Sequence, residues 1–133
     1  MRAGPPPAAR PPTGAASVIE MDAEAFEDLV ANELELLPAA MLDGLENVVF
    51  VVEDRPEDGS LDLLGLYDGL ALTERDRYGF GDLPDRIIVY REPHLHACDD
   101  AAELRDEVHT TLVHEIAHFY GIDDERLHEL GWA

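Results

Sequence analysis

The chain contains no lysine and only one cysteine, Cys98, among its 133 residues. Its nine basic residues are therefore all arginines, and they face 30 aspartates and glutamates, which gives a formal net charge of −21. A surface this acidic repels nucleic-acid backbones and anionic membranes, so we expect neither as a partner. A lone cysteine cannot form an intramolecular disulfide, so nothing in the sequence requires an oxidising compartment.

Long apolar runs are absent as well. No segment approaches the roughly 20 apolar residues that span a bilayer. The N-terminus lacks the apolar core of a secretory signal, so by elimination we expect a cytoplasmic location. Residues 1–17 are rich in proline and alanine and almost free of large apolar side chains. Such a segment cannot offset its ordering entropy by burial, so we expect a disordered tail followed by one domain over residues 18–133.

The remaining residues show helical patterns towards both ends and strand patterns between them. Apolar spacing predicts a helix from Asp22 to Pro38, and a capping box of Asp100 and Glu103 begins a long helix that Gly121 should end. We further expect short helices over 39–45 and 124–130, strands over 48–54, 63–67 and 85–91, and a long loop with one helical turn over 70–85. This order predicts an α+β domain, with a small sheet packed against helices and a long C-terminal helix.

The chemistry is concentrated in residues 114–124, which read HEIAHFYGIDD. His114 and His118 lie four residues apart on one helix face, where two imidazoles can reach a single zinc ion. Glu115 would lie close to that metal and take a proton from a bound water. Gly121 allows a sharp turn that returns Asp124 to the metal as a third ligand, with a fourth position open for water.

The helical phase supports this interpretation. The apolar residues of the long helix form one stripe, made of Leu104, Val108, Leu112, Ile116 and Phe119. At about 100° per residue, the two histidines point roughly away from that stripe. We therefore expect them on an open face and not in the core.

The extended motif resembles the zincin-like metallopeptidases, specifically the small bacterial "minimal" zinc metallopeptidases. Residues 63–75 (LLGLYDGLALTER), 83–93 (LPDRIIVYREP) and 109–131 also resemble that family. The resemblance implies a compact zincin-like core, Zn²⁺ as cofactor, His114, His118 and Asp124 as its ligands, and Glu115 as catalytic base. It departs from the larger metzincin pattern, because the third ligand is Asp124 instead of histidine and no methionine turn follows the site.

The predicted function is therefore zinc-dependent hydrolysis of peptide bonds, with a peptide or protein as substrate. Two alternatives stay open: a zinc-binding module without catalysis, and a metal-free acidic interaction protein. The presence of Glu115 favours the enzyme, because a purely structural zinc site would not need it. Asp123 is an alternative to Asp124 as third ligand, and His128 is expected at the surface or in a supporting position.

Two other features bear on this site. His94 and His96 follow the strand over 85–91, and an extended chain would point both the same way, so a second metal is conceivable; we expect a loop instead. The strand over 85–91 could align an extended substrate by edge pairing.

The remaining candidates have a simpler expectation. Cys98 should be a small buried residue. The tyrosines that could stabilise an oxyanion should be packing residues; they are Tyr78, Tyr90 and Tyr120.

Overall fold

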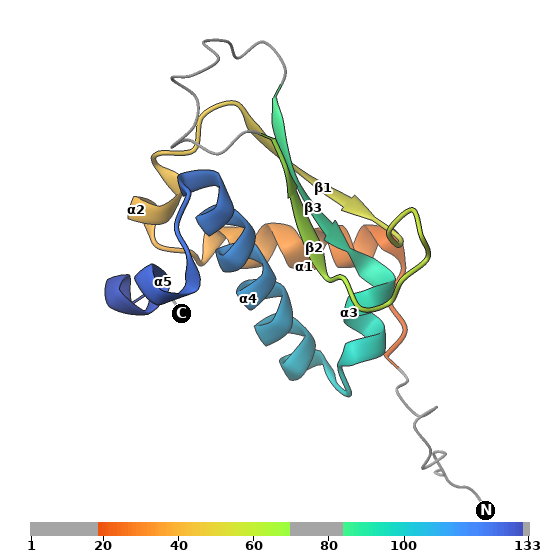
Figure 1. Ribbon diagram of the computed structural model, residues 1–133. Coiled ribbons are helices and arrows are strands. Elements are labelled where there is room, and N and C mark those ends of the chain that lie inside the picture. The colour runs from red at the N-terminus through yellow and green to blue at the C-terminus, as the bar shows by residue number, and fades with distance from the viewer. Residues whose placement is uncertain (1–18, 70–83, 132–133) are drawn as a thin grey trace, which may run out of the picture.

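A computed structural model describes residues 19–69 and 84–131 (Figure 1). The expected tail over 1–17, Tyr78 and nearly all of the expected loop over 70–85 lie outside these residues. The described elements are α1 (Ala23–Glu35), α2 (Ala39–Leu42), β1 (Val48–Glu53), β2 (Gly65–Asp68), β3 (Asp85–Tyr90), α3 (Arg91–Ala97), α4 (Ala101–Tyr120) and α5 (Asp124–Leu130). The predicted α+β class is confirmed, with a small sheet, flanking helices and a long helix near the C-terminus.

Helix α4 begins and ends at its predicted capping residues, Asp100 and Gly121, whereas α1 begins after Asp22 but ends at Glu35, before the predicted Pro38. The Asp22 carboxylate accepts a hydrogen bond from Ala25 N at the start of α1, at 2.9 Å. The Asp100 carboxylate does the same for Glu103 N at the start of α4, at 2.8 Å. Gly121 ends α4 in the left-handed conformation, with φ at 75°. That conformation is open to glycine without the steric cost of a Cβ, so the chain can turn sharply after the histidine helix.

The sheet has the strand order β1-β3-β2. β1 runs parallel to β3, while β2 pairs with β3 in the antiparallel sense, with Gly65 opposite Val89. β3 is thus hydrogen-bonded along both of its edges. The expectation that this strand aligns a substrate by edge pairing is wrong, because β3 has no free edge. Within the described residues, β2 and β1 are the edge strands.

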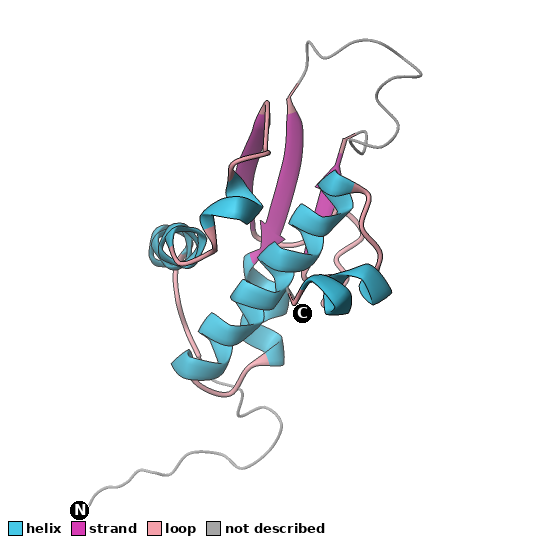
Figure 2. Ribbon diagram, turned by 90° about the vertical axis from the view of Figure 1, so that its left-hand side faces the viewer, coloured by secondary structure: helices cyan, strands magenta, loops and turns pink. Residues whose placement is uncertain are grey.

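The core lies between one face of the sheet and the two long helices. From the sheet it takes Phe50, Ile87 and Val89, which share one face because alternate strand residues point the same way. From the helices it takes Phe26 and Val30 of α1 and the apolar stripe of α4, whose members are 0–1% exposed. Figures 1 and 2 show α1 and α4 crossing beside the sheet. α4 contacts both β2 and β3.

One short helix departs from the expected pattern. The segment with His94 and His96, expected as a loop, belongs to α3, which begins at Arg91 directly after β3. Pro93 lies in the first turn of this helix, where the missing N–H breaks no helical hydrogen bond. Because residues two apart on a helix point about 200° apart, His94 is fully buried while His96 is exposed. The notion that both histidines point the same way is therefore wrong.

Candidate active site

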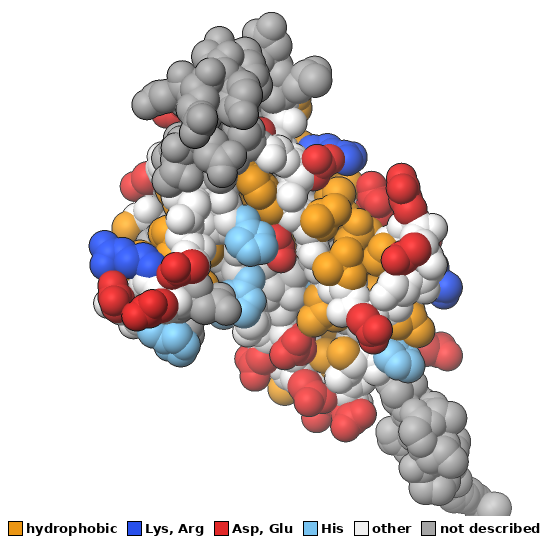
Figure 3. All heavy atoms as spheres, viewed as in Figure 1, with side chains coloured by type: hydrophobic (Ala, Val, Ile, Leu, Met, Phe, Trp, Pro, Cys, Tyr) orange, Lys and Arg blue, Asp and Glu red, His pale blue; other side chains and the backbone are white. Residues whose placement is uncertain are grey.

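The polar face of α4 carries the two motif histidines. His114 and His118 are exposed, the latter with 60% of its side chain accessible, while Leu112 and Ile116 of the apolar stripe are fully buried. The expectation that the histidines face away from the core stripe is confirmed. Figure 3 shows histidine side chains next to one another over α4, with no cover from the described elements on this face.

Glu115 lies between the histidines in sequence but differs from them in burial. The residue is only 9% exposed. Its Oε1 accepts a hydrogen bond from His118 Nδ1 at 3.0 Å. In a neutral imidazole whose Nδ1 carries this proton, Nε2 has the free lone pair that metal binding requires. Over residues 19–69 and 84–131, neither Glu115 Oε2 nor the His114 ring makes a hydrogen bond.

The edge strand β2 runs directly against this part of α4. Gly65 lies so close that a Cβ there would be 2.5 Å from Thr111 Cγ2 and 3.3 Å from Glu115 Cγ. Only a residue without a side chain permits this approach. The isolated glycine inside the predicted strand is a sequence signal for such a contact, although Gly65 was not among the predicted site residues. Gly65 therefore sets the distance between the β2 backbone and Glu115.

A cleft opens where β2 and α4 meet. Its volume is about 320 Å³. One wall is the chain entering β2 and the other is α4; the lining residues are Asp62, Leu63, Leu64, Gly65, Glu107, Thr110, Thr111, His114 and Glu115. The cleft thus joins one motif histidine to the buried carboxylate and to an edge strand.

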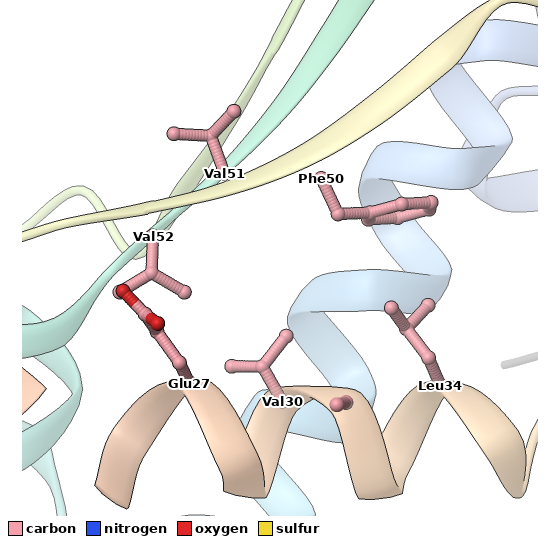
Figure 4. A pocket seen from close by; sticks show the side chains of 7 residues that line it. Glu27, Val30, Leu34, Phe50, Val51 and Val52 are labelled. Atoms are coloured by element: carbon pink, nitrogen blue, oxygen red, sulfur yellow. The ribbon is translucent and has the colours of Figure 1, made fainter. Parts of the chain in front are cut away.

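A larger hollow of about 410 Å³ lies elsewhere, between α1 and β1. Figure 4 shows Val30 and Leu34 rising from α1 towards Phe50 and Val52 of β1, with Val51 pointing away. Glu27 is the only titratable residue in its lining. This groove lacks the groups that hydrolysis needs, so the smaller cleft is the better candidate for an active site.

The third ligand position falls at the start of α5. Asp123 is the N-cap of this helix, and its Oδ1 accepts a hydrogen bond from Arg126 N at 2.9 Å. Asp124 is the first residue of α5, and its side chain lies outside the described part of the chain. His128 is exposed in the last turn of α5. Among the side chains that are described, no three His, Cys, Asp or Glu residues are grouped as a metal would require.

The donors that are described fit zinc in kind. Zinc prefers imidazole nitrogen, and a ligating histidine usually donates its other N–H to a carboxylate or carbonyl. His118 does so through Nδ1 to Glu115, and His114 stands four residues before it on the same exposed face. Two imidazoles are thus available on one side of α4, and a third donor must come from outside that helix turn.

Behind the cleft, a buried histidine fixes α4 to the end of β3. His94 is fully buried; its Nδ1–H donates to the Tyr90 carbonyl at 2.8 Å, and its Nε2 accepts from Thr111 Oγ1 at 2.9 Å. Burial lowers the pKa of His94, and this effect outweighs the opposing effects of the hydrogen bond to the Tyr90 carbonyl and of the charge of Glu107. Since Thr111 also touches Gly65, this network supports the cleft wall from behind. The network was missed from the sequence, because the local pattern placed His94 in a loop.

The remaining reactive side chains are engaged in packing. Cys98 is fully buried, as expected, and burial raises the pKa of its thiol to about 11. Tyr90 is 4% exposed, and Tyr120 donates its hydroxyl proton to the Met41 carbonyl at 2.8 Å. Both tyrosines thus behave as packing residues.

Comparison with known proteins defines the class. The zincin-like metallopeptidase family model matches residues 45–132, so the chain belongs to that family. Metallopeptidase-type function and zinc binding are thereby indicated at the level of the family. No helix among residues 19–69 and 84–131 is both long and apolar enough to cross a membrane.

The chain is also similar to a solved structure, a conserved hypothetical protein from Thermo thermophilus. The two share 30% sequence identity with a TM-score of 0.52, over 83% of this chain and 97% of that chain. A search of curated proteins found no match. The comparisons therefore give the family and the fold, and the reaction has to be argued from the site.

Proposed function

We propose that this chain is a zinc-dependent metallopeptidase that hydrolyses peptide bonds, with His114, His118 and Asp124 as zinc ligands and Glu115 as general base. One observation supports it above all others: a nearly buried carboxylate, Glu115, lies beside an exposed histidine pair and lines a cleft against an edge strand. A zinc site that only stabilised the fold would not need that carboxylate.

The proposed roles follow from the chemistry of the side chains. When bound, zinc supplies Lewis acidity, which lowers the pKa of a coordinated water to about 7 and polarises a carbonyl. Glu115 accepts a proton from the attacking water through Oε2 and delivers it to the leaving nitrogen. The hydrogen bond from His118 to Oε1 holds the carboxylate in one orientation. The low exposure of Glu115 strengthens its electrostatic interactions with the substrate.

The edge strand β2 is the proposed substrate guide, in place of β3. A peptide that pairs with an exposed sheet edge gains main-chain hydrogen bonds without dependence on its sequence. At Gly65 this edge lies against Glu115, so a paired peptide would bring a backbone carbonyl close to the general base. Because Gly65 has no side chain, the peptide, β2 and α4 can lie close together at this position.

The test is Glu115→Gln, which keeps the size and removes the basicity of the side chain. We expect one zinc per chain to remain, by elemental analysis, while cleavage of a quenched fluorescent peptide library falls at least about 100-fold. His118→Ala is the matched control and should lose the metal. Turnover that survives in Glu115→Gln would reject the general-base role.

The same measurements decide between the alternatives. Bound zinc in wild type with no hydrolysis of any library peptide would identify a zinc-binding module without catalysis. Wild-type protein without stoichiometric zinc, purified without chelators, would identify a metal-free interaction protein.

A further inference from the structure

A series of hydrogen bonds through the protein interior joins the two walls of the cleft. The chain entering β2 is tied to the end of β3, where the Tyr90 amide donates to the Leu64 carbonyl at 3.0 Å. The Tyr90 carbonyl accepts in turn from His94 Nδ1–H, and His94 Nε2 accepts from the Thr111 hydroxyl of α4. Leu64 and Thr111 line opposite walls of the cleft. His94 therefore connects the edge strand to the helix that carries Glu115.

The two walls also touch each other directly. β2 lies against α4 at Gly65, where an added Cβ would be 2.5 Å from Thr111 Cγ2 and 3.3 Å from Glu115 Cγ. Thr111 and Glu115 are four residues apart, so their side chains are neighbours on one face of the helix. The Thr111 methyl group and the Glu115 side-chain carbons thus form the surface against which the edge strand lies.

The orientation of the Thr111 side chain depends on His94. A threonine in a helix can turn its hydroxyl to a carbonyl of the preceding turn, which allows more than one rotamer. Here the hydroxyl donates to His94 Nε2 at 2.9 Å, and the methyl group points to Gly65. Rotation of Thr111 would leave a buried ring nitrogen unsatisfied, which is unfavourable. The bond to His94 therefore selects the rotamer that places the methyl group against β2.

His94 itself is held inside the fold. It is fully buried, and its ring centroid lies 5.7 Å from that of Phe26. Its helix, α3, lies beside α4 at the end of β3 (Figure 1). His94 is not among the described residues that line the cleft. Any effect of His94 on a substrate must therefore pass through Thr111 or Tyr90.

We infer that His94 is a positioning residue that, through Thr111, fixes the separation between the edge strand β2 and Glu115. The separation is a property of the fold, whereas its effect on cleavage rests on the proposed function. A peptide at the wrong distance from Glu115 still pairs with β2 but reacts slowly, because the reaction depends on alignment to within about 1 Å. Loss of the link between His94 and Thr111 should therefore lower kcat and leave KM nearly unchanged.

The first measurement is kinetic. Thr111→Val removes the hydroxyl and keeps the shape of the side chain. In the zinc-loaded full-length chain, on a library peptide that wild type cleaves, we expect kcat to fall about tenfold and KM to stay within about twofold. His94→Gln should have the same effect, and the double variant should be no slower than either single one, because both act through one link. His96→Gln, an exposed position on α3, is the matched control and should keep the wild-type kcat.

The second measurement does not depend on catalysis. Gly65→Ala places a Cβ against the Thr111 methyl group and should lower the midpoint of thermal unfolding of the full-length chain. This loss should shrink to less than about half in a Thr111→Ser background, where the methyl group is absent. It should shrink similarly in a His94→Gln background, where Thr111 can turn its methyl group away. In a His96→Gln background the loss should keep its full size.

The two measurements separate this inference from the proposed function. If wild type cleaves peptides and Thr111→Val keeps the wild-type kcat, the peptidase stands and the inference fails. A Gly65→Ala loss of equal size in all backgrounds would also overturn the inference. If no peptide is cleaved, the peptidase fails and the thermal measurement alone decides whether His94 fixes the wall separation. Thr111→Val and Thr111→Ser keep both tests open if His94→Gln does not fold.

Discussion

The buried His94 should make the stability of this protein depend on pH in a defined direction. His94 is fully buried, with both ring nitrogens hydrogen-bonded, and burial holds its pKa below the usual value of about 6.5. In the unfolded chain the imidazole titrates near about 6.5. Below that pH the unfolded state binds a proton that the folded state does not. The free energy of unfolding must therefore decrease as the pH falls from about 6.5 towards the folded pKa.

The magnitude follows from proton linkage. If His94 stays neutral in the folded state, the free energy of unfolding decreases by about 1.4 kcal/mol between pH 7.5 and pH 5.5. His94→Gln removes this titration while keeping a side chain that can both donate and accept. At pH 7.5 we expect the variant to be less stable by about 1–3 kcal/mol, because the Tyr90 carbonyl and the Thr111 hydroxyl lose well-aligned partners.

Urea unfolding, followed by circular dichroism at steps of half a pH unit, measures both effects. The difference in the free energy of unfolding between wild type and His94→Gln should narrow by up to about 1.4 kcal/mol as the pH falls to 5.5. Titrations common to both proteins cancel in that difference. His96→Gln, at an exposed position on the same helix, is the matched control. The difference in the free energy of unfolding between wild type and His96→Gln should stay constant over this pH range. A gap for His94→Gln that does not change with pH would refute the assignment of a neutral, buried imidazole.

Two further predictions test the surroundings of the cleft. Gly65→Ala should destabilise the protein by about 1–3 kcal/mol and lower peptide cleavage. The new Cβ would lie 2.5 Å from Thr111 Cγ2 and would push β2 away from α4. An unchanged free energy of unfolding would show instead that this contact relaxes freely. Cys98 is fully buried, and the pKa of its thiol is raised to about 11. At pH 8 only about 0.1% of this thiol would be thiolate in the folded protein. Its reaction with a disulfide reagent at pH 8 should therefore be far slower in the folded protein than in 6 M guanidinium. Equal rates in both states would contradict the buried position.

The sequence by itself determined the features that depend on local spacing. Periodicity along one helix separated the stripe around Leu112 and Ile116 from His114 and His118, and Asp100 and Gly121 defined where that helix begins and ends. A helix repeats every 3.6 residues whatever it packs against, so these relations can be read without the fold. The motif on which the proposed metal ligands and general base rest belongs to this local class.

The tertiary structure decided what depends on which segments become neighbours. β3 reads as a strand in the sequence, yet only the pairing order made it central and left β2 as the edge beside Glu115. The hydrogen bond between His94 and Thr111 and the cleft between the chain before β2 and α4 likewise join segments far apart along the chain. Strand order is set by long-range packing and not by the residues of any one strand, so local pattern predicts the elements of this site but not its walls.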